Sequence, residues 1–246
     1  MKVISRGRDY GYEMVGVTML FFRGEKVSLY TGGELPREDY VLTEAEVRSG
    51  RVSLSVTVER DGRRYEASEI IPVEEKDLDR SCEMHLAVML YRILSQITGI
   101  RPKWGVLTGI RPVKLLQRRI DRGISREEIY REFHEDYLVS EEKLRLAFAT
   151  QEKEHEILSR NTPDSFSLYI SIPFCPSRCL YCSFVSHSIE KTYKLMDAYI
   201  DRLCEEIAHT ARVAEQCGIQ LRTVYFGGGT PTSITAEQLR RLTDCV

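Results

Sequence analysis

The stretch SIPFCPSRCLYCSF, residues 171–184, places Cys175, Cys179 and Cys182 close together with the spacing C-x3-C-x2-C. Thiolates are soft ligands, and they select zinc or iron–sulfur clusters. The polar start of the chain, MKVISRGRDY, does not fit an export signal, so we expect a cytoplasmic protein. In that reducing compartment, clustered cysteines bind metals or act in catalysis more often than they form disulfides.

The bulk composition is that of an ordinary globular protein. The chain has 246 residues, of which 42% are hydrophobic and 29% charged, and its net charge is -2. This length predicts one or two domains, each able to bury a core. The small net charge gives no reason to expect binding to nucleic acid or membrane, and no apolar run reaches the roughly 20 residues of a membrane helix. We interpret the scattered cysteines as core or surface thiols: Cys82, Cys204, Cys217 and Cys245.

Residues 1–160 are predicted to form an N-terminal α+β domain, with strands in 1–75 and helices in 77–159. The stretches VGVTMLFF (15–22) and VSLSVTVERDGRRYEASEIIPV (52–73) are rich in β-branched and aromatic residues, and Asp61-Gly62 predicts a hairpin turn in the second. From 77 to 98, apolar residues recur every three or four positions, as on one face of a helix. Ser125 and Glu128 have the spacing of a capping box.

The motif TGIRP occurs twice, at 98–102 and 108–112. One interpretation is structural, because Gly99 can end one helix and Pro112 can open the next. The other interpretation makes Arg101 and Arg111 an anion-binding pair. A basic face, which suits either solvent or an acidic ligand or RNA backbone, continues along the second predicted helix at Arg111, Lys114, Arg118 and Arg122.

The stretch SRNTPDSFS, residues 159–167, has the composition of a linker. After it the sequence predicts a strand over 167–172, a helix over 189–216 and a second strand in RTVYF (222–226). A last helix begins at a capping box formed by Thr235 and Gln238. A β-α-β-α order predicts parallel strands with helical crossovers, and therefore an α/β domain over 166–246.

Two kinds of metal site fit the three cysteines. A structural zinc site needs four ligands, and His187 would complete a Cys3His set. Three features favour an iron–sulfur cluster instead. The cysteine loop follows a strand of a parallel sheet, where ligand sites gather. Three thiolates leave one iron of a four-iron cluster open, and the next strand ends in GGGTPT (227–232), whose glycines let a ligand approach the backbone.

The stretch YISIPFCPSRCLYCSF (169–184), together with GGGTPT, resembles the radical S-adenosylmethionine (SAM) enzymes, and more narrowly the oxygen-independent coproporphyrinogen III dehydrogenase group. LTGIRPVKLLQRRIDRG (107–123) and the β-rich N-terminal region are similar to the HemZ branch of that group. The resemblance implies a [4Fe–4S] cluster on Cys175, Cys179 and Cys182, with S-adenosyl-L-methionine at the open iron. Reductive cleavage of SAM gives a 5′-deoxyadenosyl radical, which in the coproporphyrinogen enzymes takes hydrogen from a propionate before carbon dioxide leaves.

The resemblance also implies places for other residues and for partners. Tyr181 would lie beside the adenine, and Tyr169 near the cluster and SAM. The methionyl amino group would be approached by Gly227, Gly228, Gly229 and Thr230. The implied partners are a small-molecule tetrapyrrole substrate and an electron donor such as flavodoxin or ferredoxin, with no role for membranes or nucleic acid.

Two positions depart from the decarboxylases of this group. Phe184 stands where they carry a further cysteine, and Ser171 stands where they carry a histidine. The Phe184 pattern is closer to the branch described as haem chaperones. Two functions therefore stay open: a radical SAM oxidoreductase that decarboxylates coproporphyrinogen III or a related tetrapyrrole in haem biosynthesis, and a haem- or cluster-binding delivery protein with the same cofactor fold.

The resemblance implies a partial (β/α)6 barrel, whereas residues 166–246 have room for two βα units. We therefore expect the chain to be the front part of a longer protein, with an incomplete radical SAM domain. Two parallel strands leave apolar faces uncovered, so TVYF (223–226) and the inner side of the 189–216 helix are expected to be exposed. We also expect that this chain by itself does not cleave SAM.

Overall fold

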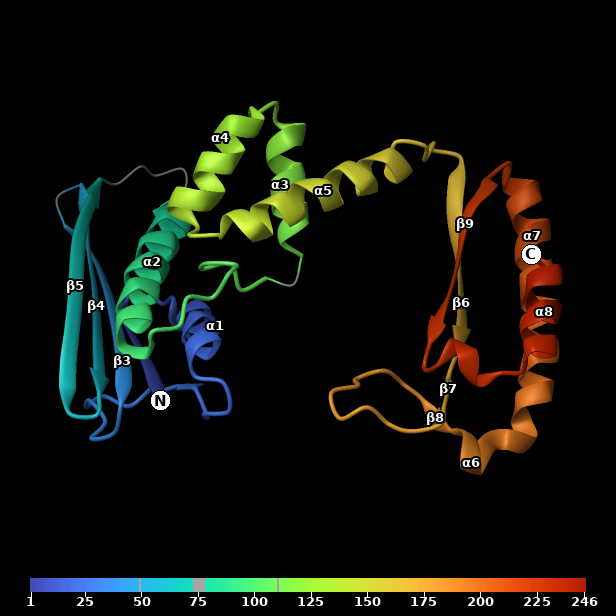
Figure 1. Ribbon diagram of the computed structural model, residues 1–246, viewed down its shortest axis with the longest axis horizontal. Helices are drawn as coiled ribbons and strands as arrows, with labels where there is room; N and C mark the ends of the chain where they lie inside the picture. The colour runs from blue at the N-terminus through green and yellow to red at the C-terminus, as the bar shows by residue number, and fades with distance from the viewer. Residues whose placement is uncertain (49, 73–77, 110) are drawn as a thin grey trace. The chain divides into compact units, whose positions relative to one another are not determined.

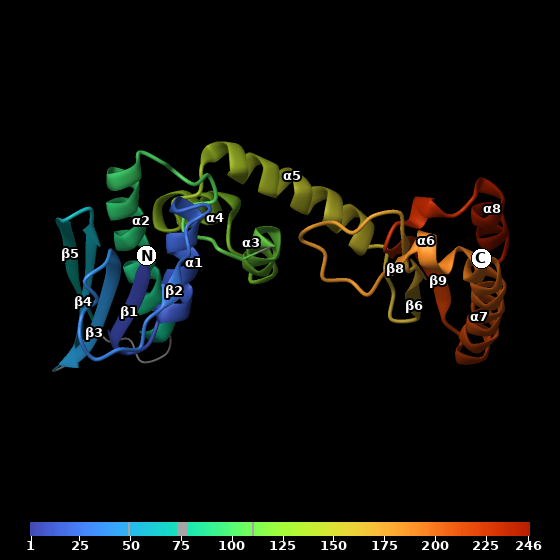
Figure 2. The same ribbon diagram turned by 90° about the horizontal axis from the view of Figure 1, so that it is seen from below.

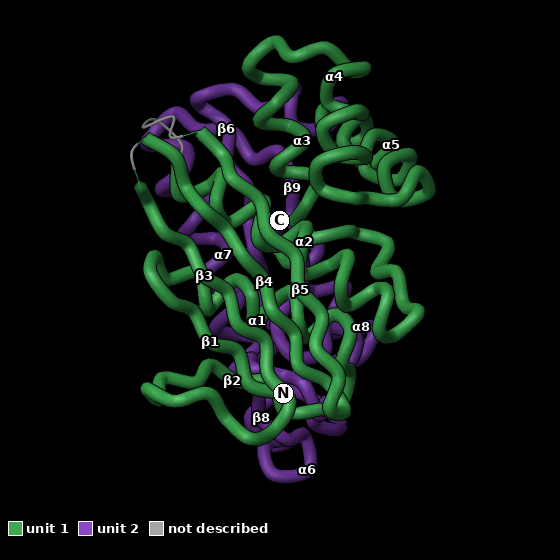
Figure 3. The backbone as a smooth tube through the Cα atoms, turned by 90° about the vertical axis from the view of Figure 1, so that its left-hand side faces the viewer, with its two compact units in different colours: residues 1–155 green, residues 156–246 purple. Residues whose placement is uncertain are grey.

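The computed structural model of the chain describes residues 1–48, 50–72, 78–109 and 111–246. These residues form two compact units, Met1–His155 and Glu156–Val246 (Figure 3). The predicted end of the strand region at 75 and the start of the helical region at 77 lie outside the described residues, as does Ile110 of the second TGIRP motif. No helix among the described ranges is long and apolar enough to cross a membrane.

The first unit contains a five-stranded mixed sheet in the order β2-β1-β3-β4-β5. β1 pairs in parallel with β2 and β3, whereas β3, β4 and β5 are antiparallel neighbours. Asp61 and Gly62 turn the chain between β4 and β5 with φ angles of 50° and 70°, which confirms the hairpin prediction. The strands run over Lys2–Gly7 (β1), Ser28–Leu29 (β2), Tyr40–Arg48 (β3), Arg51–Arg60 (β4) and Arg63–Pro72 (β5).

Two helices, α1 (Gly11–Phe21) and α2 (Leu78–Thr98), cover one face of this sheet (Figures 1 and 2). Leu86, Leu90 and Leu94 of α2 are fully buried with the inward residues of β4, as the apolar spacing over 77–98 predicts. Side chains on alternate positions of β4 point to the same face, so Val52, Leu54, Val56 and Val58 all join this core.

The prediction of a strand over 15–22 is wrong, because α1 occupies this segment. Met14, Val17 and Phe21 are three and four residues apart, and all three are buried in the core between the sheet and α2. The ring of Phe21 also packs edge-on against Tyr91 of α2, with 5.3 Å between the ring centroids. Tertiary packing therefore outweighs the β propensity of VGVTMLFF.

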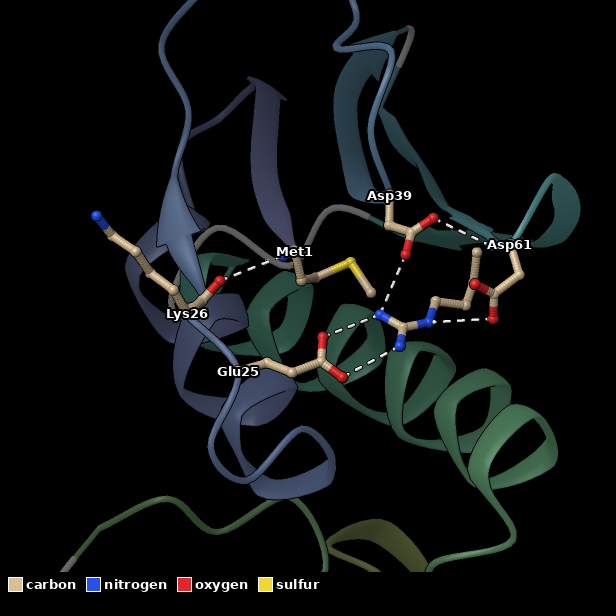
Figure 4. A network of polar contacts seen from close by, with 6 residues as sticks. Met1, Glu25, Lys26, Asp39 and Asp61 are labelled. Atoms are coloured by element: carbon tan, nitrogen blue, oxygen red, sulfur yellow. Dashed lines mark hydrogen bonds and ion pairs between the residues drawn. The ribbon is translucent and has the colours of Figure 1, made fainter.

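Arg60, the last residue of β4, joins the hairpin turn at Asp61 to the chain segments at Glu25 and Asp39. Figure 4 shows these three carboxylates pointing toward one another. The Arg60 guanidinium forms two hydrogen bonds with the Glu25 carboxylate, at 3.0 and 3.1 Å, and lies 3.1 Å from Asp39. It also lies over the Phe22 ring, 4.9 Å from the centroid. The arginine side chain is only 22% exposed, so these contacts tie the loop at Glu25 to the sheet.

The remaining helices of the first unit follow α2. Ser125 and Glu128 form the predicted capping box of α4. Arg119 of α3 is buried, and its Nε lies 2.8 Å from the Glu132 carboxylate, so this ion pair links α3 to the π-helical turn η1. The division between the units falls near the end of the last helix. The bounds are Pro112–Asp121 (α3), Arg126–Arg131 (α4), Glu132–Asp136 (η1) and Glu141–Leu158 (α5).

The TGIRP motifs stand at helix boundaries. Gly99 follows α2 with a φ of 71°, and its N–H donates to the Ser95 carbonyl at 3.0 Å. Pro112 is the first residue of α3. The structural interpretation of both motifs is therefore confirmed. The predicted amphipathic helix is also confirmed, because Leu116 is fully buried and the four cationic side chains of the basic face are exposed: Arg111, Lys114, Arg118 and Arg122.

The second unit is built on two parallel strands, β6 and β9, which are connected through α7. Figure 1 shows α7 and α8 along the same side of this strand pair. The capping box of Thr235 and Gln238 opens α8 as predicted. The elements are Ser165–Ile172 (β6), Phe174–Cys175 (β7), His187–Ser188 (β8), Ile189–Thr192 (α6), Tyr193–Leu195 (η2), Met196–Cys217 (α7), Gln220–Gly228 (β9), Pro231–Ser233 (η3) and Ala236–Asp244 (α8).

One face of the β6–β9 pair is covered. Ile170 and Ile172 of β6 are buried with Ile200 and Ile207 of α7, so the inner side of this helix is not exposed as expected. On the other face Tyr225 is 65% exposed, in agreement with the prediction for TVYF. The inner side of α7 is buried because one helix and one strand are enough to cover each other's apolar face. The chain is thus a mixed α/β protein, as predicted.

Candidate cluster and cofactor site

The cysteine motif and the glycine triplet meet at one edge of the second unit. β6 and β9 are parallel, and their last residues pair Ser171 with Gly227 and Ile172 with Gly228. The contact continues beyond the strands, because the Gly229 N–H donates to the Ile172 carbonyl at 2.8 Å. The carboxyl ends of parallel strands are where ligands bind in open α/β sheets, so this edge is the candidate site.

Cys175 is the most firmly placed of the three cysteines. It ends β7, which pairs in parallel with β8, and the His187 N–H donates to the Pro173 carbonyl at 2.7 Å. Its side chain is buried, and the Thr230 hydroxyl donates to Sγ at 3.5 Å. A Cβ added to Gly229 would lie 2.6 Å from this sulfur. The backbone after β9 is therefore packed directly against the thiol.

Cys179 and Cys182 lie in the loop between β7 and β8. The Cys182 N–H donates to the Cys179 carbonyl at 3.0 Å, so a tight turn separates the two residues. Cys179 is exposed and Cys182 is partly buried. Among the described residues, no three cysteine, histidine or acidic side chains are gathered closely enough to hold a metal ion. The structure thus joins Cys175 to the glycine triplet, but it preassembles neither a three-cysteine set nor a Cys3His set with His187.

The residues present fit an iron–sulfur cluster in their chemistry. Three thiols are supplied by one short loop, and soft thiolate ligands suit iron–sulfur clusters. A Cβ at Gly229 would clash with the Cys175 sulfur at 2.6 Å, so glycine is what lets the backbone after β9 lie this close to the thiol. Cys175, Cys179 and Cys182 are therefore the residues that would hold such a cluster.

The protein's own packing requires glycine at position 228, whereas at position 227 a side chain would meet only the exposed tyrosine rings. A Cβ at Gly227 would lie 2.4 Å from the Tyr169 hydroxyl. Gly228 has a φ of 102°, and a Cβ there would lie 2.7 Å from Ser171 Oγ and 2.9 Å from the Ile172 nitrogen. Only glycine adopts this conformation readily, so the close pairing of β9 with β6 is one reason for the triplet. Its approach to a cofactor, and that of Thr230, stays a prediction.

The sequence reasoning missed Tyr225. Tyr169 and Tyr225 occupy paired positions on β6 and β9, and their rings pack with 5.5 Å between centroids. Tyr169 is 56% exposed on the same face. The signal for this pair was available, because Tyr169 and Tyr225 stand on two strands predicted to be parallel neighbours. Together they form an aromatic surface beside Gly227.

Tyr181 lies in the cysteine loop and is 91% exposed. Leu180, Phe184 and Val185 of the same loop are exposed as well. This loop therefore presents apolar side chains to its surroundings next to the cysteines. The predicted position of Tyr181 beside an adenine is not tested by these contacts.

Tyr199, a partly buried tyrosine of α7, connects this helix to the carboxyl end of β6. The Tyr199 hydroxyl donates to the Ser171 carbonyl at 2.7 Å, and its ring packs edge-on against Phe174 at 5.3 Å between centroids. Burial, with a smaller contribution from Glu206, raises the pKa of Tyr199. The hydroxyl therefore stays protonated and keeps the carboxyl end of β6 in place.

Comparison with known proteins identifies the class of this unit. Residues 169–244, which lie within the second unit, match the Radical SAM superfamily. It is 31% identical over 234 residues to the oxygen-independent coproporphyrinogen-III oxidase-like protein HemZ of Bacillus subtilis, an alignment that covers 91% of this chain and 45% of the relative. The chain thus spans about half the length of that relative.

Two further similarities are confined to part of the chain. The haem chaperone HemW of Bacillus subtilis is 40% identical over 80 residues, which cover 32% of this chain and 20% of the relative. The oxygen-independent coproporphyrinogen III oxidase of Escherichia coli is 33% identical over 87 residues, which cover 35% of this chain and 18% of the relative. The similarity to HemZ extends over both units, whereas these two cover about a third of the chain.

Proposed function

We propose that Cys175, Cys179 and Cys182 bind a [4Fe–4S] cluster and that SAM binds beside it, in a protein that acts on coproporphyrinogen III or a related tetrapyrrole. The observation that carries this proposal is the contact of the Cys175 thiol with Gly229 and Thr230, which joins the cysteine loop to the glycine triplet. The match of residues 169–244 to the Radical SAM superfamily supports it. When bound, the cluster supplies the electron that cleaves SAM reductively.

The protein's own residues position and shield the reactants. Cys175 provides a fixed anchor, because β7, β8 and the backbone after β9 hold it. The exposed loop carries the two other ligands and Tyr181, so it closes over a bound group from one side. Tyr169 and Tyr225 supply an aromatic wall beside Gly227, which excludes water from that side. The partial barrel fold and an electron donor such as flavodoxin or ferredoxin belong to the same proposal.

An anaerobic turnover assay tests the enzymatic function. The reconstituted full-length protein that contains this chain is mixed with SAM, a reductant and coproporphyrinogen III, and 5′-deoxyadenosine and carbon dioxide are quantified. We expect both products from the full-length protein, with carbon dioxide dependent on the porphyrinogen, and no SAM cleavage by residues 1–246 alone. A protein with an intact cluster that forms 5′-deoxyadenosine but no carbon dioxide would exclude this decarboxylation and leave another radical reaction.

The second candidate is haem or cluster delivery. Phe184 stands where the decarboxylases carry a further cysteine, and the chain is 40% identical to a haem chaperone over 80 residues. This function predicts stable haem binding and transfer to an apoprotein without 5′-deoxyadenosine. Haem transfer is followed by the absorption band of the acceptor under the same anaerobic conditions, so one preparation distinguishes the two functions.

A further inference from the structure

Thr230 is placed to act on the sulfur of Cys175. Its hydroxyl donates to Sγ at 3.5 Å, and its backbone N–H donates to the Phe174 carbonyl at 2.9 Å. The backbone bond fixes Thr230 relative to the residue that immediately precedes the cysteine. The preceding residue, Gly229, is held as well, because its N–H donates to the Ile172 carbonyl at 2.8 Å. The hydroxyl is therefore positioned by rigid backbone.

The other two cysteines have no comparable partner. Among the described residues, no side-chain hydroxyl donates a hydrogen bond to the sulfur of Cys179 or Cys182. Cys179 is exposed, whereas Cys175 is buried beneath the end of β9. The environment of the three thiols is thus unequal, both in burial and in the hydrogen bond that Thr230 donates to Cys175.

A threonine hydroxyl has one proton to donate and two lone pairs that accept. Donation to Sγ uses that proton. Reduction of an iron–sulfur cluster adds negative charge that is shared with the ligand sulfurs, so a hydrogen-bond donor stabilises the reduced form. Hydrogen bonds to sulfur are one of the factors that set cluster potentials.

We propose that Thr230 is a positioning residue that donates a hydrogen bond to the Cys175 sulfur and raises the reduction potential of the cluster held there. This inference rests on the proposed [4Fe–4S] site. The effect on the potential operates without SAM. A residue that contacts SAM alone leaves the potential of the SAM-free cluster unchanged, and that difference makes the inference testable.

Three variants test the hydroxyl. Thr230→Val keeps the branched shape and removes the donor, and Thr230→Ser keeps the donor. Ser233→Ala is the matched control, because Ser233 Oγ donates to the Phe174 carbonyl at 3.2 Å and not to a sulfur. Each protein is reconstituted anaerobically, its iron and sulfide are measured, and the midpoint potential is determined by redox titration without SAM, followed by electron paramagnetic resonance.

We expect Thr230→Val to hold the cluster at a more negative midpoint potential than the wild type, while Thr230→Ser and Ser233→Ala stay at the wild-type value. Loss of iron in Thr230→Val alone, with full iron in the other two variants, also supports the hydrogen bond to Cys175. Equal potentials in the wild type and Thr230→Val, or loss of iron in Thr230→Ser as well, overturn the inference. Absence of a [4Fe–4S] cluster from the wild type overturns the proposed function itself.

Discussion

Gly229→Ala tests whether the contact between the glycine triplet and Cys175 organises the site. The added Cβ would lie 2.6 Å from the Cys175 sulfur and 2.9 Å from the Phe174 carbonyl oxygen. Non-bonded heavy atoms are at their best separation at roughly 3.5–4.0 Å, so the sulfur has to move by about 1 Å. Unlike its neighbour Gly228, Gly229 does not have a positive φ, and the cost is therefore steric rather than conformational.

The expected effect follows from the atoms that the methyl group meets. Extra atoms in a packed interior cost about 1–3 kcal/mol, and the Phe174 carbonyl cannot move freely because it accepts from the Thr230 N–H at 2.9 Å. We therefore expect the free energy of unfolding to fall by about 1–3 kcal/mol in denaturant titration. Displacement of Cys175 should also remove most of the iron from the anaerobically reconstituted protein.

Gly218→Ala is the control for this experiment. Gly218 ends α7 with a φ of 67°, and no atom lies within 4 Å of a Cβ added there. This variant should lose about 1 kcal/mol through backbone strain and keep its iron. Full iron content and wild-type stability in Gly229→Ala would refute the steric argument, and equal loss of iron in both variants would show that the effect is not specific to Cys175.

Three other outcomes are expected. Cys179→Ala should lose most of the roughly four irons per chain in an iron assay, while Cys82→Ala keeps them; zinc retained in place of iron through anaerobic reconstitution would contradict the cluster assignment. Arg60→Ala should lower the free energy of unfolding by about 1–2 kcal/mol near pH 7, because a bidentate, partly exposed ion pair is removed. Hydrogen bonding to Arg60 lowers the pKa of Glu25, so this stabilisation is present at pH values above the ordinary glutamate pKa and is lost as the pH falls. If wild type and variant keep the same difference in free energy of unfolding at low pH, the ion pair is not its cause. Burial and the neighbouring Cys245 raise the pKa of Cys204 to about 11 from 9.0. At pH 8 the thiolate form of Cys204 is then about 100-fold scarcer than that of a cysteine with the ordinary pKa, so mass spectrometry should show correspondingly slow labelling by iodoacetamide. Rapid labelling of Cys204 would contradict its burial.

Local chemistry made much of the fold predictable. Asp61-Gly62 specifies a two-residue hairpin turn by itself, and the capping box of Ser125 and Glu128 specifies a helix start. Such signals depend on a few neighbouring residues, so the sequence alone is sufficient to predict the turn and the helix start. The segment 15–22 was mispredicted because its β-branched and aromatic residues suit both a strand and a buried helix, and the choice depends on α2, which comes much later in the chain.

The candidate site was predictable in its ligands and less so in its contacts. The spacing of the three cysteines, and the position of the glycine triplet one strand later, were sufficient to bring both to one edge. The pairing register of β6 with β9 could not be predicted from the sequence. This register places Tyr225 beside Tyr169 and packs Gly228 on Ser171. The sequence therefore suggested a cofactor as the reason for the glycines, whereas strand packing supplies an independent one.

The short β7–β8 pairing closes the cysteine loop at its base through contacts of the protein's own backbone. Phe174 and Cys175 are held beside His187 and Ser188, so the ends of the loop are joined by backbone hydrogen bonds. Metal binding then has to order only the residues between them, in contrast to zinc fingers, whose folding depends on the metal. The hydrophobic core of Ile170, Ile200 and Ile207 forms without any contribution from the loop cysteines. We therefore expect that oxidative loss of the proposed cluster leaves the second unit folded.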